Sequence, residues 1–187
     1  MPLTGNVVTL GNSITEGAGI SPGQKYPDVL RAALGHDWQV FNLGHSNFTT
    51  SLLLAGFAEV QSHYAPRAPN NILVVNEISN EIDQGVSEAT AKANMQALIA
   101  MGRASGWRVL FATTTPRDAA HFSAAQNLAC ANINDFFRNN PSERDGFIDW
   151  AADPSLDDPT DATYYQDGVH PTAAGAAILA TLVQAQL

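Results

Sequence analysis

Short apolar runs alternate with longer amphipathic segments along the whole chain. The apolar runs predict five strands, of which the last is weak, at residues 7–10, 38–43, 71–77, 108–114 and 146–149. The run NILVVNE (71–77) is apolar at consecutive positions, which is typical of a strand covered on both faces. Between these runs, the periodicity and the capping residues predict helices at 26–34, 50–63, 87–106, 123–139 and 172–187.

Local signals mark the ends of several of these helices. Pro27 stands in the first turn of the helix that Gly35 ends. Ser87 and Thr172 are expected to cap the starts of their helices, and Gly106 to end one. The alternation of strands and helices predicts an α/β fold, a three-layer αβα sandwich around a mainly parallel sheet of about five strands. We expect residues 1–187 to form a single domain.

Composition narrows the class of protein. Of the 187 residues 45% are hydrophobic and 14% are charged, which favours a folded domain over a disordered chain. The net charge of −9 argues against a nucleic-acid partner or an anionic membrane surface. No apolar stretch reaches the ~18 residues of a membrane span, so we expect no integral membrane association.

The single cysteine, Cys130, can form no intrachain disulfide and is expected to be a buried, inert thiol. The first predicted strand begins close to Met1, and no signal peptide precedes it. The chain is therefore expected to be a cytoplasmic protein, a mature secreted form or an excised domain, and its compartment stays open.

Two segments at opposite ends of the chain carry the candidate chemistry. The stretch VVTLGNSITEGAG (7–19) places Ser13 on a turn directly after the first strand, and YYQDGVHPT (164–172) holds Asp167 and His170. A serine hydroxyl becomes a nucleophile when a base takes its proton and a third group orients that base. Because sites in parallel sheets lie at the carboxyl ends of the strands, Ser13, His170 and Asp167 are predicted to meet there as nucleophile, base and orienting carboxylate.

Four blocks of the chain resemble, in order, those of the SGNH hydrolases, also called the GDSL esterase/lipase family. They are LGNSITEG, VFNLGHSNFT, VVNEISNEI and DGVHPTAAG. KYPDVLRAAL and TTTPR also resemble the family's first helix and late-strand loop. The resemblance implies a flavodoxin-like sandwich and ester hydrolysis through an acyl-enzyme, with no cofactor or metal. It also implies the catalytic set Ser13, Asp167 and His170, and an oxyanion hole formed by Ser13, Asn47 and Asn80.

The chain departs from the family pattern at several of these positions. Asn12 replaces the usual aspartate, which keeps the shape and an acceptor oxygen but loses the charge. Asn47 stands where the family has glycine; a backbone N–H survives this change, and asparagine tolerates left-handed geometry. Gly44 is expected to shape the same loop. In the third block, Ile78 replaces glycine and Glu81 replaces aspartate. These changes indicate a divergent member.

The family covers several ester substrates. The chain has no long apolar lid segment, which favours short acyl groups, acetyl first, and an O-acetylated carbohydrate or other small-molecule ester as substrate. One alternative is a catalytically weakened or inactive carbohydrate-binding module that keeps the fold. Another is a lysophospholipase or thioesterase. The oligomeric state is not determined by the sequence.

Other residues offer competing interpretations. Ser46 in GHSNF (44–48) resembles the nucleophile elbow of α/β-hydrolases, although Phe48 stands where the elbow needs a small residue. The acid-rich loop DPSLDDPTD (153–161) lacks EF-hand spacing and is expected to be a solvated loop rather than a calcium site. The other histidines stand in no metal-ligand spacing; they are His36, His45, His63 and His121.

Three aromatic residues flank the segment that carries Asp167 and His170. They are Trp150, Tyr164 and Tyr165. They are expected either to line a substrate cleft or to pack in the core, and the sequence favours neither.

Overall fold

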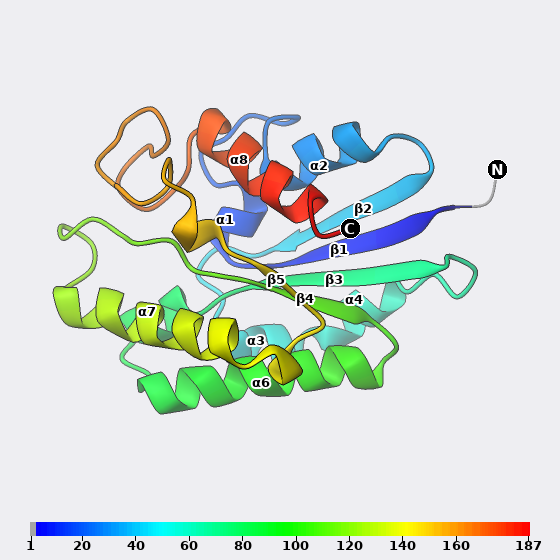
Figure 1. Ribbon diagram of the computed structural model, residues 1–187, viewed down its shortest axis with the longest axis horizontal. Coiled ribbons are helices and arrows are strands. Elements are labelled where there is room, and N and C mark those ends of the chain that lie inside the picture. The colour runs from blue at the N-terminus through cyan, green and yellow to red at the C-terminus, as the bar shows by residue number, and fades with distance from the viewer. Residues whose placement is uncertain (1–2) are drawn as a thin grey trace.

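Five parallel strands form one sheet at the centre of the molecule. The computed structural model describes residues 3–187. The strands are β1 (Gly5–Gly11), β2 (Trp38–Gly44), β3 (Asn70–Asn76), β4 (Arg108–Ala112) and β5 (Gly146–Ile148). Their spatial order is β2-β1-β3-β4-β5, and each neighbouring pair runs parallel (Figure 1). The predicted sheet is thereby confirmed, including its short last strand.

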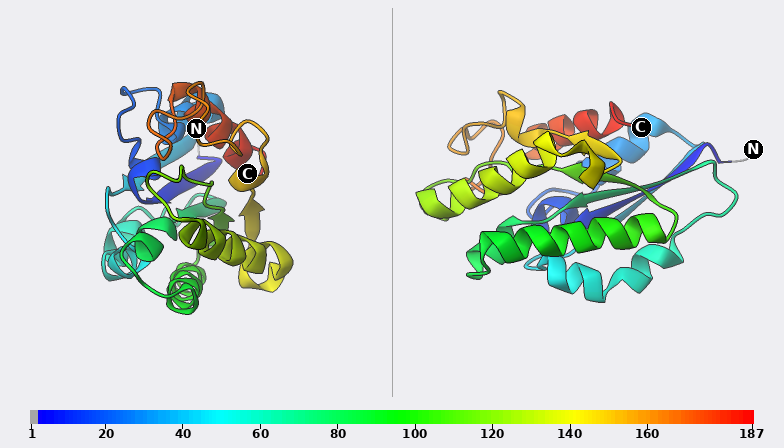
Figure 2. Two further views of the ribbon diagram at one scale, coloured as in Figure 1. Left: turned by 90° about the vertical axis from the view of Figure 1, so that its left-hand side faces the viewer. Right: turned by 60° about the horizontal axis from the view of Figure 1, so that its bottom comes forward.

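Helices cover both faces of this sheet, which confirms the three-layer sandwich. One face carries α2 (Tyr26–Leu34) and α8 (Ala173–Gln184). The other carries α3 (Thr50–Ala55), α4 (Phe57–Ser62), α6 (Glu88–Ala104) and α7 (Ala124–Asn139). The two helical layers lie above and below the sheet in Figure 1, and the turned views of Figure 2 show the same arrangement. None of the helices formed by residues 3–187 combines the length and the apolarity that crossing a membrane requires.

The consecutive apolar positions of β3 are explained by the two cores that its side chains enter. Ile72 and Val74 belong to the core beneath α2 and α8, whereas Leu73 and Val75 belong to the core against the opposite layer. All four side chains are at most 1% exposed. Because successive side chains of a strand point to opposite faces, only a continuous apolar run can fill both cores.

Ser87 and Thr172 cap their helices as predicted. The Ser87 hydroxyl accepts from the backbone N–H of Thr90, and the Thr172 hydroxyl accepts from that of Gly175. The prediction of one helix over 50–63 was wrong, because the segment divides at Gly56 into α3 and α4.

Two one-turn helices, α1 (Ser13–Glu16) and α5 (Ser79–Asp83), were not predicted. They are too short to show a hydrophobic period. Two 3₁₀ turns, Pro141–Glu143 and Trp150–Ala152, complete the connections.

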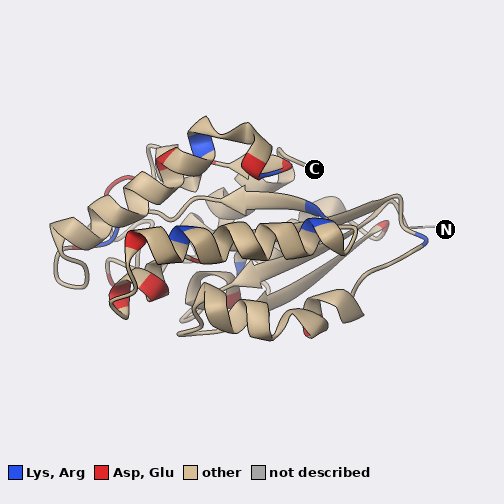
Figure 3. Cartoon of the chain, turned by 90° about the horizontal axis from the view of Figure 1, so that it is seen from below, with Lys and Arg blue, Asp and Glu red and all other residues tan. Residues whose placement is uncertain are grey.

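Charged residues are sparse on the face of the molecule that α6 and its neighbouring helices form (Figure 3). Figure 3 shows that the described Lys and Arg positions of α6 and its neighbours are separated from one another by uncharged residues. Acidic residues outnumber basic ones two to one over the whole chain, 18 against 9. The surface therefore does not concentrate positive charge on this face.

The carboxyl ends of the three central strands lie side by side. In the sheet register, Gly11 at the end of β1 is paired with Gly44 of β2 and with Asn76 of β3. The chain turns at once from β1 into α1, and α1 lies directly against the end of β2. A Cβ atom built on Gly44 would stand 2.0 Å from the backbone nitrogen of Glu16 and 2.4 Å from the carbonyl carbon of Thr15. The absence of a side chain at Gly44 therefore allows α1 to approach the sheet this closely. Gly44 also stands directly before the loop that follows β2.

We expect Gly44→Ala to destabilise the fold by about 1–3 kcal/mol or more, because backbone atoms of α1 cannot yield as a flexible side chain would. Gly56→Ala is the matched control. A Cβ at Gly56 meets its nearest atom at 3.5 Å, and its φ of −88° suits alanine. The control should be neutral or stabilise by about 0.4–1 kcal/mol. Urea unfolding of the two variants measures both effects, and equal stabilities would contradict the close approach.

Candidate active site

Ser13 is the first residue of α1, directly beyond the end of β1. Asn12 caps this helix: its backbone is extended, and its side-chain Oδ1 accepts from the backbone N–H of Ile14 at 2.9 Å. The Ser13 side chain is largely buried, at 9% exposed. The short helix thus holds the hydroxyl in one place at the carboxyl edge of the sheet, where sites of open α/β folds lie.

The His170 imidazole links Ser13 to Asp167. His170 Nε2 lies 2.9 Å from Ser13 Oγ, and His170 Nδ1 lies 2.8 Å from Asp167 Oδ2. When Nδ1 carries the proton and donates to the carboxylate, Nε2 is left to accept from the serine hydroxyl. The fold therefore brings together residues 157 positions apart in the sequence into a continuous hydrogen-bonded series.

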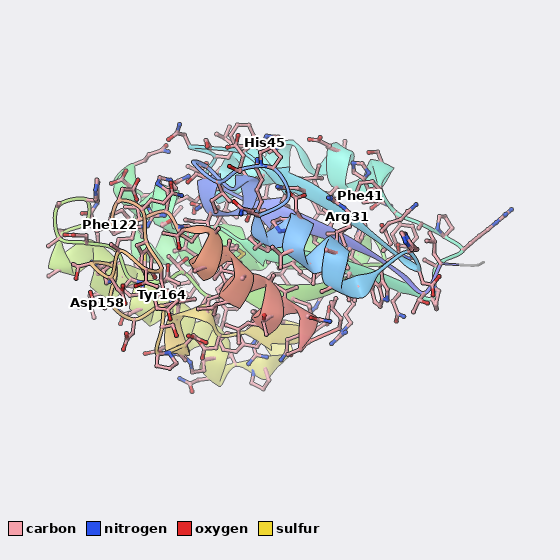
Figure 4. The ribbon with its side chains drawn as sticks, turned by 90° about the horizontal axis from the view of Figure 1, so that it is seen from above. Arg31, Phe41, His45, Phe122, Asp158 and Tyr164 are labelled. Carbon is pink, nitrogen blue, oxygen red and sulfur yellow. The ribbon has the colours of Figure 1, made fainter. Side chains whose placement is uncertain are left out.

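The turn between Asp167 and His170 is fixed by its own backbone. Asp167 Oδ1 accepts from the N–H groups of His170 at 2.8 Å and Val169 at 3.0 Å. Gly168 has a φ of +79°, which glycine adopts without strain, and its carbonyl accepts from the N–H of Asp118 at 2.9 Å. The loop after β4 thus supports this turn from outside. Figure 4 labels Phe122 of that loop at the same end of the molecule as Asp158 and Tyr164.

These contacts keep Asp167 ionised. Burial acts to raise the pKa of this carboxyl, but the backbone N–H and the imidazole of His170, together with the N–H of Val169, outweigh it and lower the pKa below its ordinary value. An ionised Asp167 holds the imidazole proton on Nδ1. The electrostatics and the geometry therefore favour the same tautomer of His170.

The loop after β2 approaches α1 from the side. Asn47 has a φ of 64°, and it alone among the described non-glycine residues has a positive φ. The backbone N–H of Ser46 donates to Glu16 Oε2 at 2.8 Å, and the Ser46 hydroxyl donates to the same oxygen. The Ser46 hydroxyl bond is the main reason that the pKa of Glu16 is lowered. The left-handed Asn47 thus follows a residue that is anchored to the helix of Ser13.

Asn80 lies in the first turn of α5, beyond the end of β3. One proton of its Nδ2 is donated to the carbonyl oxygen of Phe48 at 2.8 Å. Gln84 Nε2, also from the α5 region, donates to the carbonyl of Asn47 at 3.3 Å. Because an amide nitrogen carries two protons, Asn80 retains a second donor. Asn47 and Asn80 therefore belong to one hydrogen-bonded edge of the site.

Ser46 has no imidazole base within hydrogen-bond reach in the described structure. Its hydroxyl is directed to Glu16, and the neighbouring His45 ring stacks on Phe48 and lies 3.6 Å from the Glu59 carboxylate. A nucleophilic serine needs a base within hydrogen-bond reach. Ser13 has the His170 imidazole, which Asp167 orients. Ser46 has only the Glu16 carboxylate, a weaker base because its pKa is lowered.

The three aromatic residues that flank the segment of Asp167 and His170 are packed against the core. Trp150 and Tyr165 are 1% and 3% exposed and donate to the carbonyls of Leu179 and Leu156, so they pack in the core, and both also line the small cavity described below. Tyr164 is half-buried against the same core.

In the acid-rich loop, aspartate side chains accept from backbone N–H groups two residues ahead, as in ordinary turns. Among residues 3–187, no group of three or more His, Cys, Asp or Glu side chains is placed to hold a metal ion.

The sequence assigned no role to the buried Glu77 or to the half-buried Arg117. Glu77 is 0% exposed and contacts the side chain of Asn12 and the backbone of Asn80. The Arg117 guanidinium donates to Ser79 Oγ and lies 4.8 Å from the ring centre of Phe122. One feature of the sequence could have pointed to Glu77: its carboxyl directly follows the apolar strand NILVVN, where a charged residue is unexpected.

A small cavity lies beside the site. It has a volume of about 10 Å³ and is lined by Ile14 and Pro171, the sequence neighbours of Ser13 and His170, and by Ser79 and Arg117 among others. This space is about that of one water molecule. The cavity is too small to admit an extended acyl chain.

Comparisons with known proteins agree with this architecture. The model of the GDSL-like Lipase/Acylhydrolase family matches residues 9–178. No curated protein sequence matches the chain significantly.

Several solved structures share the fold. A member of the lipolytic protein G-D-S-L family from Veillonella parvula has a TM-score of 0.80 at 16% identity, with 96% of both chains covered. The native aryl esterase of M. smegmatis has a TM-score of 0.76 at 14% identity, also with 96% of both chains covered. A carbohydrate acetylesterase family member from Sinorhizobium meliloti has a TM-score of 0.70 at 19% identity, covering 99% of this chain and 96% of that one.

Cys130 is buried in α7, at 4% exposed, and burial raises the pKa of its thiol to about 12. The thiolate is the reactive form, so we expect iodoacetamide at pH 8 to leave Cys130 unmodified in the native protein and to alkylate it in urea. Mass spectrometry of the two samples measures the modification. Rapid alkylation of the folded protein would show an accessible thiol and contradict this burial.

Proposed function

Because the chain belongs to the GDSL-like lipase/acylhydrolase family, we propose that it is a single-domain serine ester hydrolase acting through an acyl-enzyme on Ser13. The observation that carries this proposal is the hydrogen-bonded series from Ser13 Oγ to His170 and on to Asp167. This series contains a nucleophile, a base at 2.9 Å and a carboxylate that orients the base at 2.8 Å.

In the acylation step, Ser13 Oγ attacks the ester carbonyl carbon while His170 Nε2 takes the hydroxyl proton. The imidazolium that forms is stabilised by Asp167. The backbone N–H groups of Ser13 and Asn47 and the second Nδ2 proton of Asn80 stabilise the tetrahedral oxyanion. His170 then gives its proton to the leaving alcohol, and the acyl group remains on Ser13.

In the deacylation step, His170 takes a proton from a water molecule that attacks the acyl carbon. The second tetrahedral species is stabilised by the same donors, and its collapse returns the proton to Ser13 Oγ and releases the carboxylic acid. Every proton transfer passes through His170 Nε2, which explains why Asp167 must hold the other ring nitrogen.

The preferred substrate is a short acyl ester, acetyl first, and an O-acetylated carbohydrate is the favoured alcohol part. The cavity of about 10 Å³ beside the site supports this choice, because it is too small for a long acyl chain. Two proteins of the same fold are described as an aryl esterase and as a carbohydrate acetylesterase family member. A lysophospholipase or thioesterase would need a longer apolar groove than this cavity offers.

A panel of p-nitrophenyl esters tests this proposal, with acetate, butyrate and octanoate compared at equal concentration, followed by acetate release from a peracetylated sugar. We expect kcat/KM to be highest for acetate and lowest for octanoate. Ser13→Ala should lower kcat on the order of 10⁶-fold and abolish labelling by a fluorophosphonate. Ser46→Ala should keep most of the activity.

A preference for octanoate would contradict the short-acyl assignment. Folded wild-type protein that neither turns over any ester nor reacts with the fluorophosphonate would support the alternative of a non-catalytic binding module. Labelling of Ser46 in place of Ser13, located by peptide mapping, would overturn the assigned nucleophile.

The oxyanion hole gives a separate prediction. Alanine cannot replace the side-chain amide of Asn80, so Asn80→Ala should lower kcat by roughly 10²–10³-fold with KM little changed. Asn47→Gly keeps the backbone N–H and suits the φ of 64°, so it should lower kcat far less. Steady-state kinetics of both variants measures the difference. The reverse order of effects would exchange the roles assigned to Asn47 and Asn80.

A further inference from the structure

Glu77 is a buried carboxylate that contacts two active-site elements without being part of either. It directly follows β3 and is 0% exposed. Its Oε1 accepts from the backbone N–H groups of Asn80 at 2.8 Å and Glu81 at 3.3 Å, which caps the start of α5. Its Oε2 accepts from Asn12 Nδ2, at the start of α1. One side chain therefore joins the helix of Ser13 to the helix of Asn80.

Asn12 is the other half of this connection, and its amide has a defined orientation. Its Oδ1 must face the backbone N–H of Ile14, which can only donate, at 2.9 Å. Its Nδ2 therefore faces Glu77 and, at 3.2 Å, Ser79 Oγ. An aspartate here would set a second carboxylate oxygen against that of Glu77, and like charges this close cannot both remain ionised.

Resting on the function proposed above, we propose that Glu77 is a positioning residue for ester hydrolysis, which sets Ser13 and the Asn80 amide relative to each other through Asn12. The same contact explains why position 12 holds an amide where the family pattern has an aspartate. In its ionised form Glu77 can only accept, and it accepts at three points, so the partner that matches this form at position 12 is a donor.

The surroundings of Glu77 fit this role. Burial raises the pKa of its carboxyl to about 8, against the opposing effects of Asn12, of the Arg117 guanidinium and of the two backbone N–H groups. Arg117 reaches the cluster through the hydroxyl of Ser79, to which it donates. A buried carboxyl is costly unless hydrogen bonds and a nearby cation compensate it, and here both are present.

Exchanging the two partners tests the direction of this hydrogen bond. Glu77→Gln keeps an oxygen for Asn80 and Glu81 but turns an NH₂ group against that of Asn12. Above pH 8, where Glu77 is ionised, Asn12→Asp turns a carboxylate against that of Glu77, so kcat is compared at that pH. Each single variant should lower kcat by about 10–10²-fold, the loss expected when catalytic groups are displaced by about 1 Å, with KM changed less than threefold.

The double variant Asn12→Asp with Glu77→Gln restores a complementary pair. The aspartate introduced at position 12 accepts from the N–H of Ile14 with one oxygen. Its other oxygen accepts from the amide of the glutamine introduced at position 77. We expect the double variant to recover kcat to within about fivefold of the wild type, a strongly non-additive result.

Glu81→Gln is the matched control. Glu81 lies within α5 and is likewise a fully buried glutamate, but its Oε1 accepts from Ser51 and Asn94, away from Asn12. Its kcat should stay near that of the wild type. Circular dichroism and thermal melts of all variants separate displacement from unfolding. If a single variant fails to fold, a double variant that is folded and active supports the pairing, and a double variant that is unfolded or inactive overturns it.

The outcomes separate the two proposals. A folded wild-type protein without ester turnover would overturn the proposed function, and this inference with it. If both single variants keep the kcat of the wild type, the positioning role of Glu77 is overturned and the proposed function stands. The same follows if the double variant is no more active than the single variants. A rise in KM with kcat unchanged would also overturn the positioning role, because it would indicate an effect on substrate binding rather than on the alignment of catalytic groups.

Discussion

The common direction of the five strands is the constraint on which the rest of the structure depends. Since all strands run parallel, each carboxyl end reaches the same edge of the sheet, and the register pairs Gly11 with both Gly44 and Asn76. The segments that leave these three positions have to share a small space. The close approach of α1 to Gly44 and the bond of Glu16 to Ser46 follow from that crowding. The site is thus assembled from short turns, held by one another and by the sheet beneath them.

Crowding polar turns at a buried edge carries an energetic penalty that the structure offsets with hydrogen bonds. Backbone N–H groups at the starts of α1 and α5 have no partner within their own helices. Asn12 satisfies one of them and Glu77 satisfies two. The carboxyl that does this is fully buried, and Arg117 lies close enough to lower its pKa against the effect of burial. The buried carboxyl and its neighbours are therefore part of how the backbone at this edge is held.

Much of this arrangement could be predicted from the sequence, because it depends on local patterns. Runs of a few residues are enough to predict the five strands and the capping residues Ser87 and Thr172. They also predict that the strands are buried on both faces and that Ser13 and Asn80 lie beyond strand ends. The division of helix 50–63 at Gly56 and the one-turn helices α1 and α5 did not follow, because a single turn has no period to detect. Contacts such as that of Asn12 with Glu77 join residues 65 positions apart, and no local pattern specifies them.

The effect of a departure from a family motif depends on the residues that contact it in the folded protein. Taken alone, an asparagine in place of aspartate at position 12 indicates a lost charge and a weakened site. In the fold, its oxygen caps α1 and its amide nitrogen meets a carboxylate, so the residue is matched on both sides. Asn47 is similar: asparagine occupies a left-handed position that would otherwise call for glycine. Both substitutions preserve what the backbone requires, and this favours divergence of an intact site over its decay.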